Sequence, residues 1–148
     1  MIIMKCAMEL MMTATVKAEE NARRAEEMAK EEAIRIARKE AAKITNTIKY
    51  CEELGHSLEA IANKGKKPTV SFFCDKKGTR LKETTREYAD RRLSYTSCGE
   101  TLNLEVMAEW FDPYCFDVII EDFQYWKYTC GRVDGYKVTI TPKPVCIN

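Results

Sequence analysis

The sequence contains a single histidine, His56, and its six glycines are scattered along the chain. General-base catalysis and activation of a cysteine nucleophile usually depend on an imidazole, so one isolated histidine argues against such chemistry. The glycines never approach the spacing of a Walker or dinucleotide-binding loop, which excludes the common phosphate-binding loops. We therefore predict no catalytic residue and no bound cofactor, and we expect a non-enzymatic protein.

Paired cysteines are also absent, although cysteine itself is abundant. The chain has seven cysteines, an odd number, and no two of them lie closer than 15 residues. This pattern lacks the CxxC pairs of a zinc site and forms a poor disulfide framework. We predict no metal site. We expect free thiols buried in the core, Cys51 and Cys74 among them, in a protein of the reducing cytoplasm.

The first residues, MIIMKCAMELMMTATVKA, are apolar enough to suggest a leader peptide. Glu9 interrupts the apolar run, and Lys5 is the only basic residue before it. The run is too short and too charged to span a bilayer. We expect a soluble, cytoplasmic protein that is neither secreted nor inserted in a membrane.

A strong net charge is missing, but the charges are unevenly distributed. Residues 1–63 carry 10 basic and 11 acidic groups, residues 64–92 carry 10 and 4, and residues 93–148 carry 4 and 8. The net charges of the three segments are therefore −1, +6 and −4. A basic middle and an acidic end can support two opposite kinds of electrostatic contact.

Residues 15–54 contain neither glycine nor proline and are dense in strong helix formers, which predicts a long helix. Acid-to-base pairs four residues apart support it: Glu19 with Arg23, Glu20 with Arg24, Glu26 with Lys30, and Glu31 with Arg35. In its second half a seam of apolar residues repeats at steps of three and four: Ile34, Ala37, Ala41, Ile44, Ile48 and Cys51. The seam predicts either packing within the chain or self-association between chains.

Gly55 is expected to end or bend this helix. Ser57 can then cap a short second helix that runs to Asn63, so the region can form a helix-turn-helix. Gly65 and Pro68 stop the helical region, because glycine favours the residue after a helix and proline cannot continue one.

We assign residues 1–66 to a helical arm and residues 67–148 to a compact α+β domain with a mainly antiparallel sheet and two short helices. The predicted elements are strands at 69–74 and 80–83, a turn at 75–78, helices at 85–93 and 104–112, and strands at 116–120, 125–130 and 136–140. A capping box, Thr84 with Glu87, supports the first short helix. The pair Asp134 and Gly135 predicts a hairpin turn.

Basic residues gather after the first predicted strand and interleave with tyrosines: Lys76, Lys77, Arg80, Lys82, Arg86, Arg91 and Arg92. Positive groups release counterions from a phosphate backbone, and tyrosine can stack on bases. The basic segment Lys64 to Arg92 is therefore a candidate nucleic-acid-binding site. The same charges can instead form a solvated surface on which Glu87 and Asp90 pair with the arginines.

Acidic residues accompany the aromatic residues of the last third of the chain. Glu105, Glu109 and Asp112 can present carboxylates to a basic surface of a protein partner, in imitation of nucleic-acid phosphates. The alternative is that the aromatic residues, Trp110 among them, form the core and leave the acids on the outside.

In its size, its charged helical arm and its lack of an enzymatic motif, the chain resembles the accessory proteins of bacteriophages and mobile elements, including the anti-CRISPR inhibitors. The resemblance is one of general character and transfers no residue. It implies a protein-binding module that occludes a host nucleic-acid-processing enzyme of the CRISPR type. The alternative function is a small nucleic-acid-binding protein that uses the basic segment Lys64 to Arg92.

Overall fold

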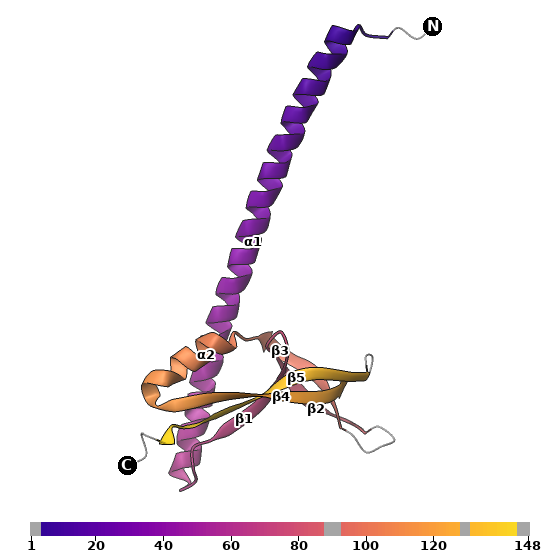
Figure 1. Cartoon of the computed structure of the whole chain (residues 1–148). Helices are drawn as coiled ribbons and strands as arrows, with labels where there is room; N and C mark the ends of the chain where they lie inside the picture. The colour runs from indigo at the N-terminus through magenta and orange to yellow at the C-terminus, as the bar shows by residue number, and fades with distance from the viewer. Residues whose placement is uncertain (1–3, 88–92, 128–130, 145–148) are drawn as a thin grey trace. The chain divides into compact units, whose positions relative to one another are not determined.

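The computed structural model of the chain describes residues 4–87, 93–127 and 131–144 (Figure 1). A long helix, α1 (Ala7–Asn63), precedes a small sheet domain with two short helices, which confirms the α+β class. The later elements are, in order, β1 (Val70–Asp75), β2 (Thr79–Glu87), β3 (Leu93–Thr101), α2 (Leu104–Phe111), the 3₁₀ helix η1 (Asp112–Tyr114), β4 (Phe116–Lys127) and β5 (Gly131–Pro142). By its internal contacts the chain forms two units, residues 1–40 and 41–148. The last part of α1 therefore belongs with the sheet domain.

α1 is a single helix of 57 residues, longer than predicted at its start and uninterrupted at Gly55. The predicted second helix is wrong, because the Ser57 hydroxyl donates to the Glu53 carbonyl oxygen (3.2 Å), one turn back in the same helix. A lone glycine lowers helix stability by about 1 kcal/mol relative to alanine. Leu54 and Leu58, on either side, are buried, and burying one leucine contributes about 1.5–3 kcal/mol. Packing therefore holds the helix together through Gly55.

The end of α1 is where the sequence placed it. Gly65 has a left-handed backbone, with φ of 76°. Its N–H donates to the Ala62 carbonyl oxygen (2.9 Å), and the Lys66 N–H donates to the Ile61 carbonyl oxygen (3.3 Å). These two bonds satisfy carbonyl groups that the last turn would otherwise leave free, and glycine adopts the required φ without steric strain.

The ion pairs on the first half of α1 follow a different spacing from the one predicted. Arg35 donates through Nε to Glu32 (3.0 Å), three residues back, and not to Glu31. Lys17 Nζ lies 3.5 Å from a carboxylate oxygen of Glu20. Both spacings place the partners on one side of the helix, so these pairs still support it by a few tenths of a kcal/mol each, about 0.2–0.5.

The five strands close into a barrel in the order β1-β2-β3-β4-β5, with β5 pairing back to β1. Among the strands that the structure describes, only β3 and β4 pair in parallel, so the predicted mainly antiparallel sheet is confirmed. Parallel neighbours need a crossover connection, and here α2 and η1 provide it (Figure 1). Closure of the sheet was not indicated by the sequence.

The helix predicted at residues 85–93 is wrong, because β2 and β3 occupy its two ends. Thr84 does not cap a helix, and its hydroxyl instead donates across to the Ser94 carbonyl oxygen on β3 (3.1 Å). Threonine suits both a helix cap and a strand, and pairing with β3 decides between them. Residues 88–92, and residues 128–130 of a predicted strand, lie outside the described part of the chain.

β4 is one strand of 12 residues where two were predicted. The predicted hairpin turn at Asp134 and Gly135 is also wrong, because Gly135 lies within β5 and pairs with Phe123 on β4. A Cβ atom on Gly135 would lie 2.5 Å from the Cys74 carbonyl oxygen and 2.9 Å from the Tyr125 ring. Glycine is required here by the close approach of its neighbours, which is the other common role of glycine in a strand.

The core lies between α1 and one face of the barrel. Cys51, Leu54 and Leu58 of α1 are at most 8% exposed. They form one cluster with buried residues from the strands, from α2 and from the segment before α2: Cys74, Leu102, Met107, Phe111, Val138 and Ile140. Cys51 and Cys74 are both 0% exposed, so their predicted burial is confirmed.

A second cluster of rings lies on the other side of β1, because Phe73 points away from Phe72 and Cys74 in the alternation of the strand. The Phe73 and Phe123 ring centroids are 4.3 Å apart, and those of Phe73 and Tyr95 are 5.6 Å apart. These residues come from β1, β4 and β3, of which β1 pairs with neither of the others. The rings therefore meet through the interior of the barrel.

Thr47 joins α1 to the start of α2. Its buried hydroxyl accepts a hydrogen bond from the Asn103 backbone N–H (2.8 Å) and donates to the Lys43 carbonyl oxygen (2.7 Å). The Asn103 side chain in turn accepts from the N–H groups of Glu105 and Val106, which caps α2. The first turn of α2 is therefore fixed relative to this part of α1.

Replacing Leu58 with alanine should lower the free energy of unfolding by about 2–4 kcal/mol, because a leucine that is 3% exposed would leave a cavity between α1 and the barrel. Urea denaturation followed by circular dichroism measures the change. The control is Leu10→Ala, since Leu10 is 47% exposed and its loss should change stability by less than about 0.5 kcal/mol. Equal effects of the two substitutions would contradict the assigned packing.

Candidate functional site

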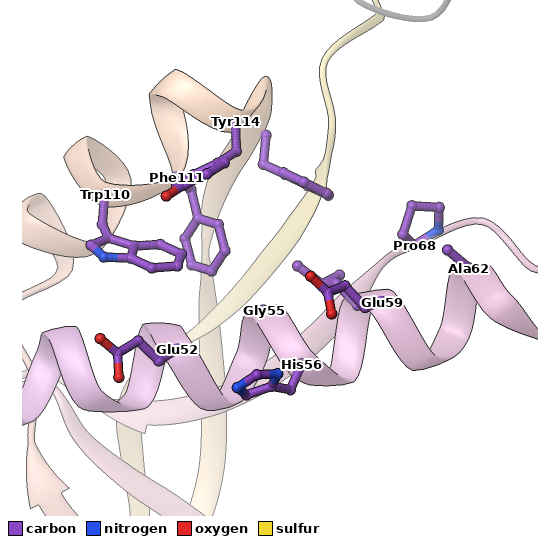
Figure 2. Close-up of a pocket in the computed structure, with 11 residues that line it drawn as sticks. Glu52, Gly55, His56, Glu59, Ala62, Pro68, Trp110, Phe111 and Tyr114 are labelled. Atoms are coloured by element: carbon purple, nitrogen blue, oxygen red, sulfur yellow. The ribbon is translucent and has the colours of Figure 1, made fainter.

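A groove of about 370 Å³ lies on the 41–148 unit, between the last turns of α1 and the segment formed by α2 and η1 (Figure 2). We call it the α1–α2 groove. Its lining is mostly apolar and comes from α1, from Pro68 after it, and from residues 110–116. Grooves of this size and character are the usual sites of ligand and peptide binding.

One wall of the groove is a face of α1. Glu52, His56 and Glu59 recur at steps of four and three, which places them along one side of the helix (Figure 2). All three are exposed. Neither carboxylate forms an ion pair with any residue that the structure describes. This wall therefore carries two carboxylates that are not engaged in ion pairs with the described residues.

The opposite wall is aromatic. The Trp110 ring centroid lies 4.8 Å from that of Phe111 and 5.2 Å from that of Tyr114. Phe111 is 1% exposed and also belongs to the core, whereas Tyr114 is 63% exposed. The wall thus has a rigid base and a ring that remains open to solvent.

The segment that carries the aromatic wall is held at both ends. Asn103 caps α2, and Cys115 ends η1 in a left-handed conformation with φ of 63°. The Lys143 backbone N–H donates to the Cys115 carbonyl oxygen (2.8 Å), and the Lys143 ammonium pairs with Asp112. The hydrogen bond to Asp112 raises the pKa of Lys143. These contacts keep Trp110 and Tyr114 in place opposite α1.

Gly55 forms the floor of the groove, below the Trp110 ring (Figure 2). A Cβ atom on Gly55 would lie 3.7 Å from the tip of that ring, which is ordinary van der Waals distance. The backbone at Gly55 is helical, so alanine fits the position and would favour the helix. Glycine is therefore not required by the fold at this position.

The sequence did not indicate the groove. His56 was expected next to a helix break, and it lies instead on continuous helix at the edge of the groove. The spacing of Glu52, His56 and Glu59 was the available signal on α1, and Trp110 with Tyr114 was its counterpart in the later segment. Nothing in either segment alone shows that the two face each other.

The predicted basic residues are distributed over several environments. Lys76 and Lys77 lie in the turn between β1 and β2, where Lys76 Nζ is 3.2 Å from Asp122 and 4.0 Å from the centre of the Tyr136 ring. Lys77 and Lys82 are exposed. Three arginines remain of the predicted basic residues. Arg86 lies on β2, but its side chain is outside the described part of the structure, as are Arg91 and Arg92.

Arg80 serves the fold. Its guanidinium lies 4.1 Å from the centre of the Tyr50 ring on α1, which is a cation–π contact. Its Nε is buried and has no hydrogen-bond partner among the described residues. Burial raises the pKa of Tyr50, and the hydrogen bond with Arg80 partly opposes that shift. These contacts hold part of the Arg80 side chain within the domain.

The predicted acidic residues lie on and after α2. Glu105 and Glu109 are exposed and four residues apart, so they share one side of α2. Asp112 is paired with Lys143 and helps to hold η1. None of the three lines the α1–α2 groove.

Comparison with family models, with curated proteins and with solved structures found no match to this chain. Among the described residues, no helix combines the length and apolar character needed to cross a membrane. The same residues contain no group of three or more histidine, cysteine or acidic side chains arranged to hold a metal ion.

The described thiols should differ sharply in reactivity. Burial raises the pKa of Cys51 to about 12 and that of Cys74 to about 11, so very little of either is thiolate at pH 8. Cys6 and Cys115 are exposed. Iodoacetamide at pH 8 should alkylate Cys6 and Cys115, and should reach Cys51 and Cys74 only in denaturant, as peptide mass mapping would reveal. Equal labelling of all four in the native protein would contradict the assigned core.

Proposed function

We propose that the chain is a non-enzymatic protein-binding module whose main contact is residues 7–40 of α1, here called the exposed arm. The observation that carries this proposal is a set of large apolar side chains in the arm that are each at least 47% exposed: Met8, Leu10, Met11, Met12, Val16, Met28, Ile34 and Ile36. Every side chain of the arm except that of Glu20 is exposed.

Such exposure has an energetic consequence. Full burial of a side chain of this kind contributes about 1.5–3 kcal/mol, so even partial cover of the arm by a partner would support binding. Exposed apolar patches on proteins commonly mark interaction sites. Methionine adds adaptability, because its unbranched, polarisable side chain packs against surfaces of different shape. A helix that lays apolar residues into a groove of its partner is a common mode of recognition.

The exposed apolar side chains of α1 can also be buried by a second copy of the chain instead of a different protein. Of the predicted seam, Ile34, Ala37, Ala41, Ile44 and Ile48 are all exposed in the single chain, and Cys51 alone is buried. Residues 1–40 carry eight basic and eight acidic side chains, so two arms side by side would not repel each other through net charge. Self-association through these five residues is therefore a second form of the same proposal.

The more specific form of the proposal is an inhibitor, from a phage or mobile element, that occludes a host nucleic-acid-processing enzyme of the CRISPR type. It rests on the resemblance in size and character described above. The exposed carboxylates of Glu105 and Glu109 support it, because they would complement a basic surface that normally binds nucleic acid.

Direct binding of nucleic acid is the alternative function. It is favoured by six exposed lysines within the basic segment: Lys64, Lys66, Lys67, Lys76, Lys77 and Lys82. Such a protein would lose affinity steeply with added salt, because counterion release drives its binding.

Capture of a partner from the native cell tests the proposal. The tagged chain is purified with nuclease treatment, beside the variant Met12→Glu, Ile34→Glu, Ile36→Glu. The matched control adds three glutamates at polar positions of the same arm, Thr13→Glu, Thr15→Glu, Asn21→Glu. We expect the wild type and the control to retain the same protein, and the apolar variant to lose at least about 90% of it, since a charge in a buried contact is strongly unfavourable.

Circular dichroism must show equal helix content in the three proteins, and light scattering must report their masses in solution. A dimer that only the apolar variant dissociates would assign the arm to self-association. Equal retention of the partner by all three proteins would contradict a role for the arm. Retained material that nuclease removes would favour nucleic-acid binding instead.

A further inference from the structure

We propose that the α1–α2 groove binds a short basic peptide segment of a partner protein, with an apolar side chain between its aromatic and helical walls and basic side chains against Glu52 and Glu59. The site is distinct from the exposed arm, because it is built entirely from residues 52–68 and 110–116 of the 41–148 unit.

The aromatic wall supplies the apolar half of the recognition. Trp110 and Tyr114 present two rings 5.2 Å apart, inclined by 38°. Tyr114 is 63% exposed although it faces a groove, so a ligand that covers it would remove a large apolar surface from water. The faces of both rings also attract cations.

The helical wall supplies the charge. Glu52 and Glu59 are seven residues apart on α1, which corresponds to about 10 Å along the helix axis. An extended peptide covers that distance with basic residues at the first and fourth positions, since each residue advances the chain by about 3.3 Å. The positions between them are then available for the apolar side chain. Both carboxylates lack a partner among the described residues, so a cationic ligand meets no competing ion pair.

Gly55 is an independent indication that the groove is kept open. Glycine inside a helix is unfavourable relative to alanine, and a Cβ atom here would meet only the tip of the Trp110 ring at 3.7 Å. Neither backbone conformation nor packing requires glycine at this position. Its absent side chain instead leaves space on the floor between the two walls, where the ligand would lie (Figure 2).

The test measures binding of a fluorescein-labelled peptide, acetyl-Gly-Arg-Leu-Leu-Arg-Gly-amide, to the full chain by fluorescence anisotropy. Two companion probes replace the arginines by glutamates or the leucines by serines. We expect saturable binding of the first peptide alone. The double variant Glu52→Gln, Glu59→Gln should raise its Kd roughly 3- to 30-fold, since two exposed ion pairs are removed.

Matched controls separate the groove from general charge. Glu100→Gln, Glu121→Gln removes the same charge at two exposed positions outside the groove and should change Kd less than about twofold. Tyr114→Ala and Gly55→Ala should both weaken binding, the first by removing a ring and the second by filling the floor. Because Tyr114 is exposed and Gly55 is helical, both variants should remain folded, which thermal denaturation verifies.

Three results would overturn the proposal. They are no saturable binding of the arginine–leucine peptide up to millimolar concentration, equal weakening by the control pair, and displacement of the peptide by tetramethylammonium together with undiminished binding of the probe whose leucines are replaced by serines. The last would make the groove a site for small organic cations. The arm variant Met12→Glu, Ile34→Glu, Ile36→Glu should bind the peptide normally, so failure of the arm proposal and failure of this one are distinguishable.

Discussion

The packing of the last turns of α1 against the barrel is the interaction on which the rest of the structure depends. Cys51, Leu54 and Leu58 are buried there, and Thr47 bonds to the residue that caps α2. This contact carries the helix through Gly55 and faces Glu52 and Glu59 toward an aromatic wall. Along the chain this packing begins at Thr47, so the part of α1 before Thr47 keeps its apolar side chains exposed to water. Both proposed binding surfaces follow from where this packing begins.

Local sequence patterns predicted the structure correctly where backbone propensity alone decides it. The absence of glycine and proline predicted the long helix, and Gly65 with Pro68 predicted its end, because backbone propensities decide both. Gly55 misled because the propensity of one residue is weaker than the burial of Leu54 and Leu58. The prediction at Gly135 was wrong for a different reason. Its neighbours suggested a turn, but a contact with the Cys74 carbonyl oxygen, distant in sequence, requires glycine.

The candidate site could not be predicted from the sequence. Its two walls are separated by about fifty residues of chain, which include β1, β2 and β3, and the core shared by Leu54, Leu58 and Phe111 holds them together. The interaction residues that we predicted from charge show the same difficulty, because the sequence does not reveal their contacts in the folded chain. Arg80 is basic in sequence but lies against Tyr50, and Asp112 is acidic but is paired with Lys143. Charge along a chain predicts partners only for the side chains that folding leaves exposed.

Hydrogen–deuterium exchange, read by mass spectrometry on the monomeric chain, tests most directly whether packing on the barrel covers α1 only from Thr47 onward. The account predicts that amides of residues 47–61 exchange about 100-fold or more slowly than those of residues 8–40, because only the former must wait for the core to open. A captured partner should then slow exchange in residues 8–40. Equal protection along the whole of α1 in the isolated monomer would contradict the account.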